Sequence, residues 1–188
     1  MLSNRLKIET RHNHHELEKK LVGSIKLIRN KEDYTRILNL FYSFFGGLEA
    51  LIDTHIDISV LADYPNRRKT AALAEDIKQL GSILPSLASG DALPPIQNHP
   101  QALGALYVIE GSTLGGKIIS KMVGQQLGIT NDAGLSFFKG YGEQTDEMWQ
   151  SFKQTIDSPA ESGDHNIIIQ SANDTFVQFS NWFDRSRV

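Results

Sequence analysis

Cysteine is absent from this chain of 188 residues, which excludes a disulfide framework and a thiolate metal site. A metal would have to be bound by His, Asp, Glu or Tyr side chains. Basic residues are in slight deficit, with 19 Lys and Arg against 22 Asp and Glu, and the net charge of -3 gives no electrostatic footprint for nucleic acid. Apolar runs are short, and none approaches the roughly 20 residues needed to span a membrane.

The first fifteen residues, MLSNRLKIETRHNHH, carry charges where a secretory signal peptide needs an apolar segment. We therefore expect a cytoplasmic protein. Hydrophobic residues make up 40% of the sequence and charged residues 22%, which is typical of a globular chain. The length suits one domain, which we expect to span residues 1–188.

Alternating strand patterns are also absent, whereas apolar residues recur at helical spacing along nearly the whole chain. The spacing predicts a single all-α bundle of six or seven helices. We expect a turn-rich linker at FFKGYGEQT, and we expect helices at about residues 3–21, 33–52, 67–80, 100–127, 146–156 and 165–184.

Three glycines stand inside the longest predicted helix, in the stretch LYVIEGSTLGGKII. Gly111, Gly115 and Gly116 each cost the helix roughly 0.8–1 kcal/mol relative to alanine. Gly111 and Gly115 are one turn apart on one face, so they indicate either a close approach to a flat ligand or the packing of another helix. Glycine also tolerates a kink. Ser112 adds a hydroxyl that can anchor a water or a bound oxygen species.

Of three clustered histidines, His14 alone falls on the apolar stripe of the first predicted helix. His12 lies about 160° and His15 about 100° away from that stripe, so we expect only His14 to face the interior. One interpretation is a core histidine with a hydrogen-bond partner. The other is a metal ligand: a single histidine cannot hold zinc, but one axial histidine suffices for iron in a porphyrin.

Two charged residues follow the same side of this helix. Glu18, one turn after His14, could orient the imidazole directly or through water. Lys7 lies two turns before it, about 10 Å along the axis, where an ammonium could meet the anionic edge of a flat ligand. Either residue could instead belong to a solvated helix face.

Two segments together resemble a known family. LGALYVIEGSTLGG is similar to the distal helix of biliverdin-producing haem oxygenases, especially the bacterial type associated with phytochromes, and LKIETRHNHHELE resembles their proximal helix. The resemblance implies that His14 is the axial ligand of haem iron and that Glu18 is its hydrogen-bond partner. It further implies that Lys7 and Lys153 meet the haem propionates.

On the distal side, the resemblance implies that Gly111 and Gly115 lie over the haem face, with Gly116 beside them. Animal members of the family carry an aspartate at the position of Ser112, whereas serine is usual in the bacterial subgroup. Gly111, Ser112 and Gly115 would therefore surround the reacting atoms, with a water network arranged differently from that of the animal enzymes.

The implied activity is oxidative cleavage of haem to biliverdin, carbon monoxide and ferrous iron. Haem would be both cofactor and substrate, and O₂ the oxidant. Because the chain has no flavin or nicotinamide motif, electrons would come from a ferredoxin or a flavodoxin with its reductase. Two alternatives stay open: a protein that binds or stores haem without degrading it, and a non-haem, thiaminase-like enzyme on a similar helical fold.

Overall fold

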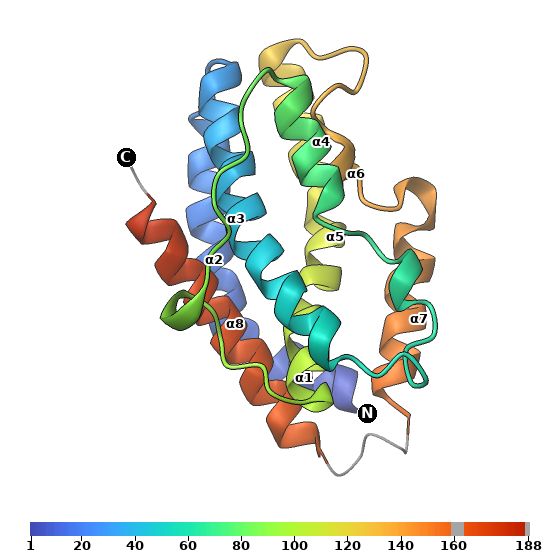
Figure 1. Ribbon diagram of the computed structural model, residues 1–188. Coiled ribbons are helices and arrows are strands. Elements are labelled where there is room, and N and C mark those ends of the chain that lie inside the picture. Colours follow the sequence, from blue (N-terminus) through green and yellow to red (C-terminus); the bar gives the residue numbers. More distant parts are fainter. Residues whose placement is uncertain (159–163, 187–188) are drawn as a thin grey trace.

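The computed structural model describes residues 1–158 and 164–186, and every regular element among them is helical. The predicted all-α fold is confirmed. Three long helices, α3 (Lys31–His55), α5 (His99–Leu127) and α8 (His165–Arg185), form the body of the molecule (Figure 1). None of the described helices has a stretch long and apolar enough to cross a membrane.

The ends of these helices follow from local sequence signals. The side chain of Asn30 accepts a hydrogen bond from the Asp33 amide at the start of α3. The side chain of Asn98 does the same for Gln101 at the start of α5, so each satisfies an amide that has no partner inside its helix. Gly128 ends α5 in the left-handed conformation, with φ of 63°, which glycine adopts without steric cost.

The core is rich in phenylalanine contributed by helices that are distant in sequence. Phe41 and Phe44 of α3 lie 5.0 and 4.8 Å from Phe179 of α8, measured between ring centroids. All three side chains are almost completely buried. Such pairs add about 0.5–1.5 kcal/mol each to the energy of burial, so the contact of α3 with α8 anchors the fold.

The N-terminal segment is divided at Thr10 into α1 (Leu2–Glu9) and α2 (Arg11–Lys26). The Thr10 hydroxyl donates to the Leu6 carbonyl oxygen at 2.7 Å. The sequence predicts one helix over about residues 3–21, whereas the helix starts at Leu2 and the Ser3 hydroxyl donates to the Asp157 carboxylate at 2.6 Å.

The remaining helices are short: α4 (Ala71–Gln79), α6 (Ser136–Lys139) and α7 (Thr145–Ile156). Single 3₁₀ turns stand at Tyr64–Asn66, Gly90–Ala92 and Gly142–Gln144. The described residues thus hold eight α-helices instead of six or seven, because the first predicted helix divides and α6 forms inside the predicted linker. In Figure 1 the segment between α4 and α5 descends along the outside of α3, where the Ala88 amide donates to the Ser43 carbonyl oxygen at 2.9 Å.

Candidate functional site

The three N-terminal histidines lie on α2, and all three are exposed, so the expectation that His14 alone faces the interior was wrong. The core side of α2 is formed by Leu17 and Ile25 instead. His14 is nevertheless distinct, because its ring packs against Phe176 of α8 with 5.4 Å between centroids. Within the described part of the chain, its ring nitrogens make no hydrogen bond. The side chain is therefore supported on one flank and free to accept a ligand.

Glu18 lies beside a different histidine from the one expected. Its carboxylate is 3.3 Å from Nδ1 of His15, and both side chains are more than half exposed. Residues 15 and 18 are separated by three positions and share a face of the helix, so this pairing competes with one to His14. An exposed pair of this kind contributes about 0–1 kcal/mol and does not fix the His14 ring.

The three glycines in the LYVIEGSTLGGKII stretch of α5 have different surroundings. A methyl group on Gly115 would meet no atom within 4 Å, whereas one on Gly116 would lie 2.4 Å from the Phe138 carbonyl oxygen. On Gly111 it would make an ordinary contact with the Trp149 ring at 3.7 Å. Gly116 thus allows the close packing of α5 against α6, while its expected place beside the cofactor stays a prediction. Only Gly115 is surrounded by open space.

Gly115 lies on an exposed apolar stripe of α5. Leu114 is 40% and Ile118 65% exposed on either side of it. Other large aliphatic side chains are also exposed in this protein, so Leu114 and Ile118 matter here because they flank the open glycine. The sequence analysis did not identify Leu114 and Ile118, although both lie within the quoted stretch.

Helices α2 and α5 are linked at two levels. At one level Thr10, directly before α2, is close enough to the Tyr107 hydroxyl to lower its pKa against the effect of burial, and at the other Gln126 Nε2 donates to the Lys26 carbonyl oxygen at 3.4 Å. These links are about 24 Å apart along α2 at 1.5 Å per residue. We name the space between them the α2–α5 interval. Along the chain, His14 lies between the two links on α2, and the Gly115 stripe lies between them on α5.

The lysines expected at the haem edge come from helices that pack side by side. Ser3 bonds Asp157, directly after α7, through both its amide and its hydroxyl. Lys7 is four residues after Ser3 and Lys153 is four residues before Asp157. Both residues are therefore about one helical turn from this contact along their own helices. The Lys153 ammonium lies 5.9 Å from the centroid of the Trp149 ring.

Ser112 is part of a polar network that the sequence analysis missed. Arg68 Nη2 donates to Ser112 Oγ at 2.6 Å, and the Ser112 hydroxyl donates to the Ile109 carbonyl oxygen at 2.7 Å. Burial lowers the pKa of Arg68 to about 10, while the nearby Glu110 carboxylate acts in the opposite direction.

Behind Arg68 lies a buried ion pair. Arg67 Nη1 donates to Glu110 Oε2 at 2.7 Å, and the two side chains are 1% and 0% exposed. The Tyr141 hydroxyl donates to the same carboxylate at 2.9 Å and accepts from the Arg68 amide at 2.8 Å. Burial and the Glu110 charge raise the pKa of Tyr141. Glu110 is the single acidic residue in the run VIEGS. A buried carboxylate requires a cationic partner, so this residue was the sequence signal for the buried ion pair.

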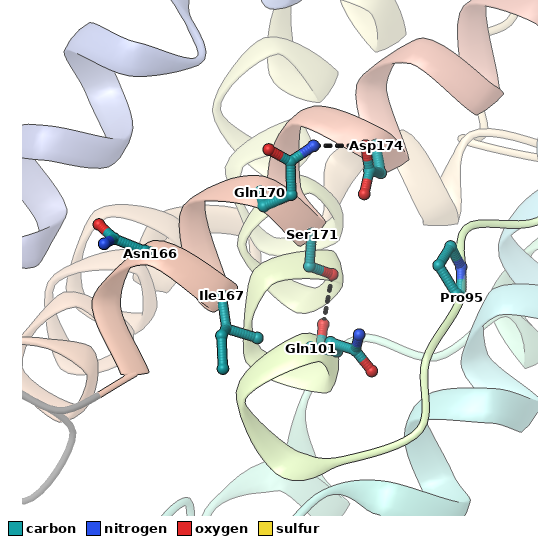
Figure 2. Close-up of a pocket in the computed structure, with 7 residues that line it drawn as sticks. All are labelled: Pro95, Gln101, Asn166, Ile167, Gln170, Ser171 and Asp174. Atoms are coloured by element: carbon teal, nitrogen blue, oxygen red, sulfur yellow. Dashed lines mark hydrogen bonds between the residues drawn. The ribbon is translucent and has the colours of Figure 1, made fainter.

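A separate pocket of about 400 Å³ lies between the N-terminal ends of α5 and α8 (Figure 2). Its polar groups are already paired: Gln170 donates to Asp174 at 2.8 Å, and Ser171 donates to the Gln101 carbonyl oxygen at 2.7 Å. No sequence-predicted site residue lines this pocket. The part of the chain that the structure describes also holds no group of three or more His, Asp or Glu side chains suited to a free metal ion.

Comparison with known proteins identifies the family to which this chain belongs. A family model described as "Heme oxygenase" matches residues 1–185. A curated heme oxygenase from Xanthomonas campestris pv. campestris is 28% identical over 134 residues, which is 70% of this chain and 76% of that protein.

Solved structures of similar fold carry the same family name. Heme oxygenase from Leptospira interrogans superposes with a TM-score of 0.78 at 20% identity, covering 98% of both chains. The Neisseria meningitidis heme oxygenase, solved with NO and with CO bound, gives 0.79 at 22% identity, covering 99% of this chain and 92% of that one. Heme oxygenase-1 from the cyanobacterium Synechocystis sp. PCC6803, solved in complex with heme, gives 0.77 at 17%, again covering 99% and 92%.

Proposed function

The chain belongs to the haem oxygenase family and is an enzyme of that family, and we propose that it cleaves haem to biliverdin, carbon monoxide and ferrous iron in the α2–α5 interval. When bound, haem supplies both the iron at which O₂ reacts and the porphyrin that is cleaved. The observation that carries the proposal is the pairing of a histidine whose ring nitrogens make no hydrogen bond to the described residues with an open glycine on the facing helix.

His14 is the residue proposed to bind the iron. Its ring rests on Phe176, which limits rotation of the imidazole, and neutral imidazole is a common axial ligand of haem. Because Glu18 pairs with His15 in this structure, its proposed role toward His14 requires either a change of rotamer or a bridging water. His12 is also exposed, but no aromatic ring of the described residues packs against it.

The opposite face is proposed to exclude bulk water. Leu114 and Ile118 are apolar and exposed, so a flat hydrophobic ligand would cover them. Gly115 leaves space for atoms on the distal side, and Gly111 is bounded by the Trp149 ring. The Ser112 hydroxyl lies at the edge of this face as a hydrogen-bonding group.

Lys7 and Lys153 are proposed to meet the two propionates. Both residues are four positions from a member of the Ser3–Asp157 contact, which joins α1 to the end of α7 and supports this assignment. Electrons are proposed to come from a ferredoxin or a flavodoxin with its reductase. The cytoplasmic location and the single domain over residues 1–188 stay predictions.

The test is a haem titration followed by reduction in air. We expect stoichiometric binding with a Soret band typical of histidine ligation, then loss of that band and growth of a biliverdin band. His14→Ala should lose the histidine-type spectrum and the conversion, while the matched variant His12→Ala should retain both. Haem that binds but is not converted would favour a storage protein, and absence of haem binding would favour a non-haem enzyme. Unchanged ligation in His14→Ala would reject the ligand assignment.

A further inference from the structure

Arg68 is held by more contacts than an ordinary surface arginine. Its Nη2 donates to the Ile109 carbonyl oxygen at 2.7 Å as well as to Ser112 Oγ, and its Nη1 donates to the Phe137 carbonyl oxygen at 3.2 Å. The guanidinium also lies over the Phe137 ring, 4.0 Å from its centroid. A planar group with this many fixed contacts has one orientation.

The contacts of Ser112 determine what its hydroxyl can do. A serine hydroxyl has one proton and two lone pairs. The proton is donated to the Ile109 carbonyl oxygen, and one lone pair accepts from Arg68 Nη2. One lone pair is left, so in this arrangement Ser112 offers an acceptor and no donor.

The third nitrogen of the guanidinium, Nε, has no partner in the described structure. Arg68 Nε is inaccessible to solvent and makes no hydrogen bond among the described residues. A buried N–H without a partner costs about as much as a lost hydrogen bond, and water commonly satisfies such groups. In the planar guanidinium, the Nε–H bond is parallel to one of the Nη2–H bonds. It therefore points toward the neighbourhood of Ser112 and Ile109.

We propose that Arg68 is a positioning residue that, together with Ser112, holds one ordered water at the flank of α5. The water accepts from Arg68 Nε–H and donates to the free lone pair of Ser112 Oγ. Its second proton remains available to a neighbouring group. The use of this water in haem cleavage rests on the proposed function, whereas the water site itself follows from the contacts of Arg68 and Ser112 alone.

The backbone of Arg68 is fixed from behind. Its amide donates to the Tyr141 hydroxyl, which is bonded to the Glu110 carboxylate, which in turn is paired with Arg67. Consecutive arginines thus have different tasks: Arg67 neutralises the buried acid, and Arg68 directs its guanidinium to Ser112. The extended conformation of Arg67, with φ of -75° and ψ of 157°, sends the two side chains apart.

A crystal structure of the haem-free protein, at a resolution that defines waters, tests the site without reference to activity. We expect a water within hydrogen-bond distance of both Arg68 Nε and Ser112 Oγ. In Ser112→Ala that water should be lost, since an ordered water needs at least two polar partners. A dry site, a protein oxygen bonded to Nε, or an undiminished water in Ser112→Ala would each overturn the proposal.

The haem-loaded protein gives a second test through variants. Arg68→Lys keeps the charge but removes the planar set of N–H donors, and Ser112→Ala removes the acceptor. Each should slow haem conversion about tenfold, the effect of one lost hydrogen bond to a charged group, while haem affinity changes less than threefold. The double variant should be no slower than either single variant, because both remove the same water.

Ser120→Ala is the matched control for these variants. Ser120 lies on the same helix and its hydroxyl makes the same kind of bond, to the Lys117 carbonyl oxygen at 3.0 Å, but no arginine bonds it in the described structure. Its conversion rate should equal that of the wild type. Fully additive losses in the double variant would overturn the shared water. If the wild type fails to bind haem, the proposed function fails, while the crystallographic water still decides the inference.

Discussion

Alanine substitutions at Gly115 and Gly116 should change the stability of the haem-free protein in opposite directions. Alanine favours a helix interior over glycine by about 0.8–1 kcal/mol. At Gly115 the added methyl group meets nothing within 4 Å, so we expect nearly the whole gain. For a protein of this size, that corresponds to a rise in Tm of about 2–4 °C.

At Gly116 the same gain is outweighed by a steric conflict. The methyl carbon would lie 2.4 Å from the Phe138 carbonyl oxygen and 3.2 Å from its carbonyl carbon. Both are backbone atoms that cannot turn aside as a side chain can. Overpacking of this kind costs about 1–3 kcal/mol, so we expect a net loss of up to about 2 kcal/mol once the helical gain of about 1 kcal/mol is subtracted.

Urea unfolding of the haem-free variants measures these changes, and a haem titration measures the second consequence. In Gly115→Ala the methyl group enters the α2–α5 interval, and haem affinity should fall about tenfold, equivalent to about 1.4 kcal/mol. Gly124→Ala is the control, because its methyl group would make only ordinary contacts, at 3.6 Å or more, with Leu135 and Ile129. Destabilised haem-free Gly115→Ala with normal haem binding would refute the reasoning.

Other changes test the remaining features. Neutralising Lys7 and Lys153 together should alter the ratio of biliverdin isomers more than the haem Kd, since exposed ion pairs contribute only about 0–1 kcal/mol; product chromatography and a titration compare the two. Glu110→Gln should cost about 3 kcal/mol in urea unfolding, because the Arg67 charge loses its buried partner; a loss below 1 kcal/mol would contradict this. Burial raises the pKa of Tyr34 above that of an unfolded tyrosine, so its contribution to stability is lost as the pH rises above 10. Tyr34→Phe should therefore lower the stability at pH 7 yet flatten the alkaline decline by up to about 1.4 kcal/mol per pH unit, as measured by unfolding at pH 9–11.

The elements that the sequence predicted well are those with local signals. Helix α5 was expected at residues 100–127 and spans His99–Leu127, because Asn98, Pro100 and Gly128 mark its ends through backbone chemistry. The third helix was expected from Arg67 but begins at Ala71. Arg67 and Arg68 are good helix formers, but outside the helix they make long-range contacts, among them those with Glu110 and Ser112, that the sequence pattern does not reveal.

The candidate site was predictable to a similar extent. His14 and Gly115 were identified from helical spacing and from family resemblance, both of which are local patterns. The different surroundings of Gly115 and Gly116 were not predictable, because they depend on the position of the Phe138 backbone in the folded chain. Glu18 is three positions from His15 and four from His14, and both spacings bring side chains together on a helix. The sequence therefore could not decide which histidine Glu18 pairs with.

Helix α2 is held to the protein more weakly than its neighbours. Of its sixteen residues, only Leu17 and Ile25 are buried, whereas α3 buries thirteen of twenty-five. Local opening costs little free energy where few apolar contacts must be broken. In hydrogen-exchange experiments, α2 amides of the haem-free protein should therefore exchange well before those of α3. Haem bound at His14 would slow that exchange, and the free energy of ordering α2 would be subtracted from the measured affinity.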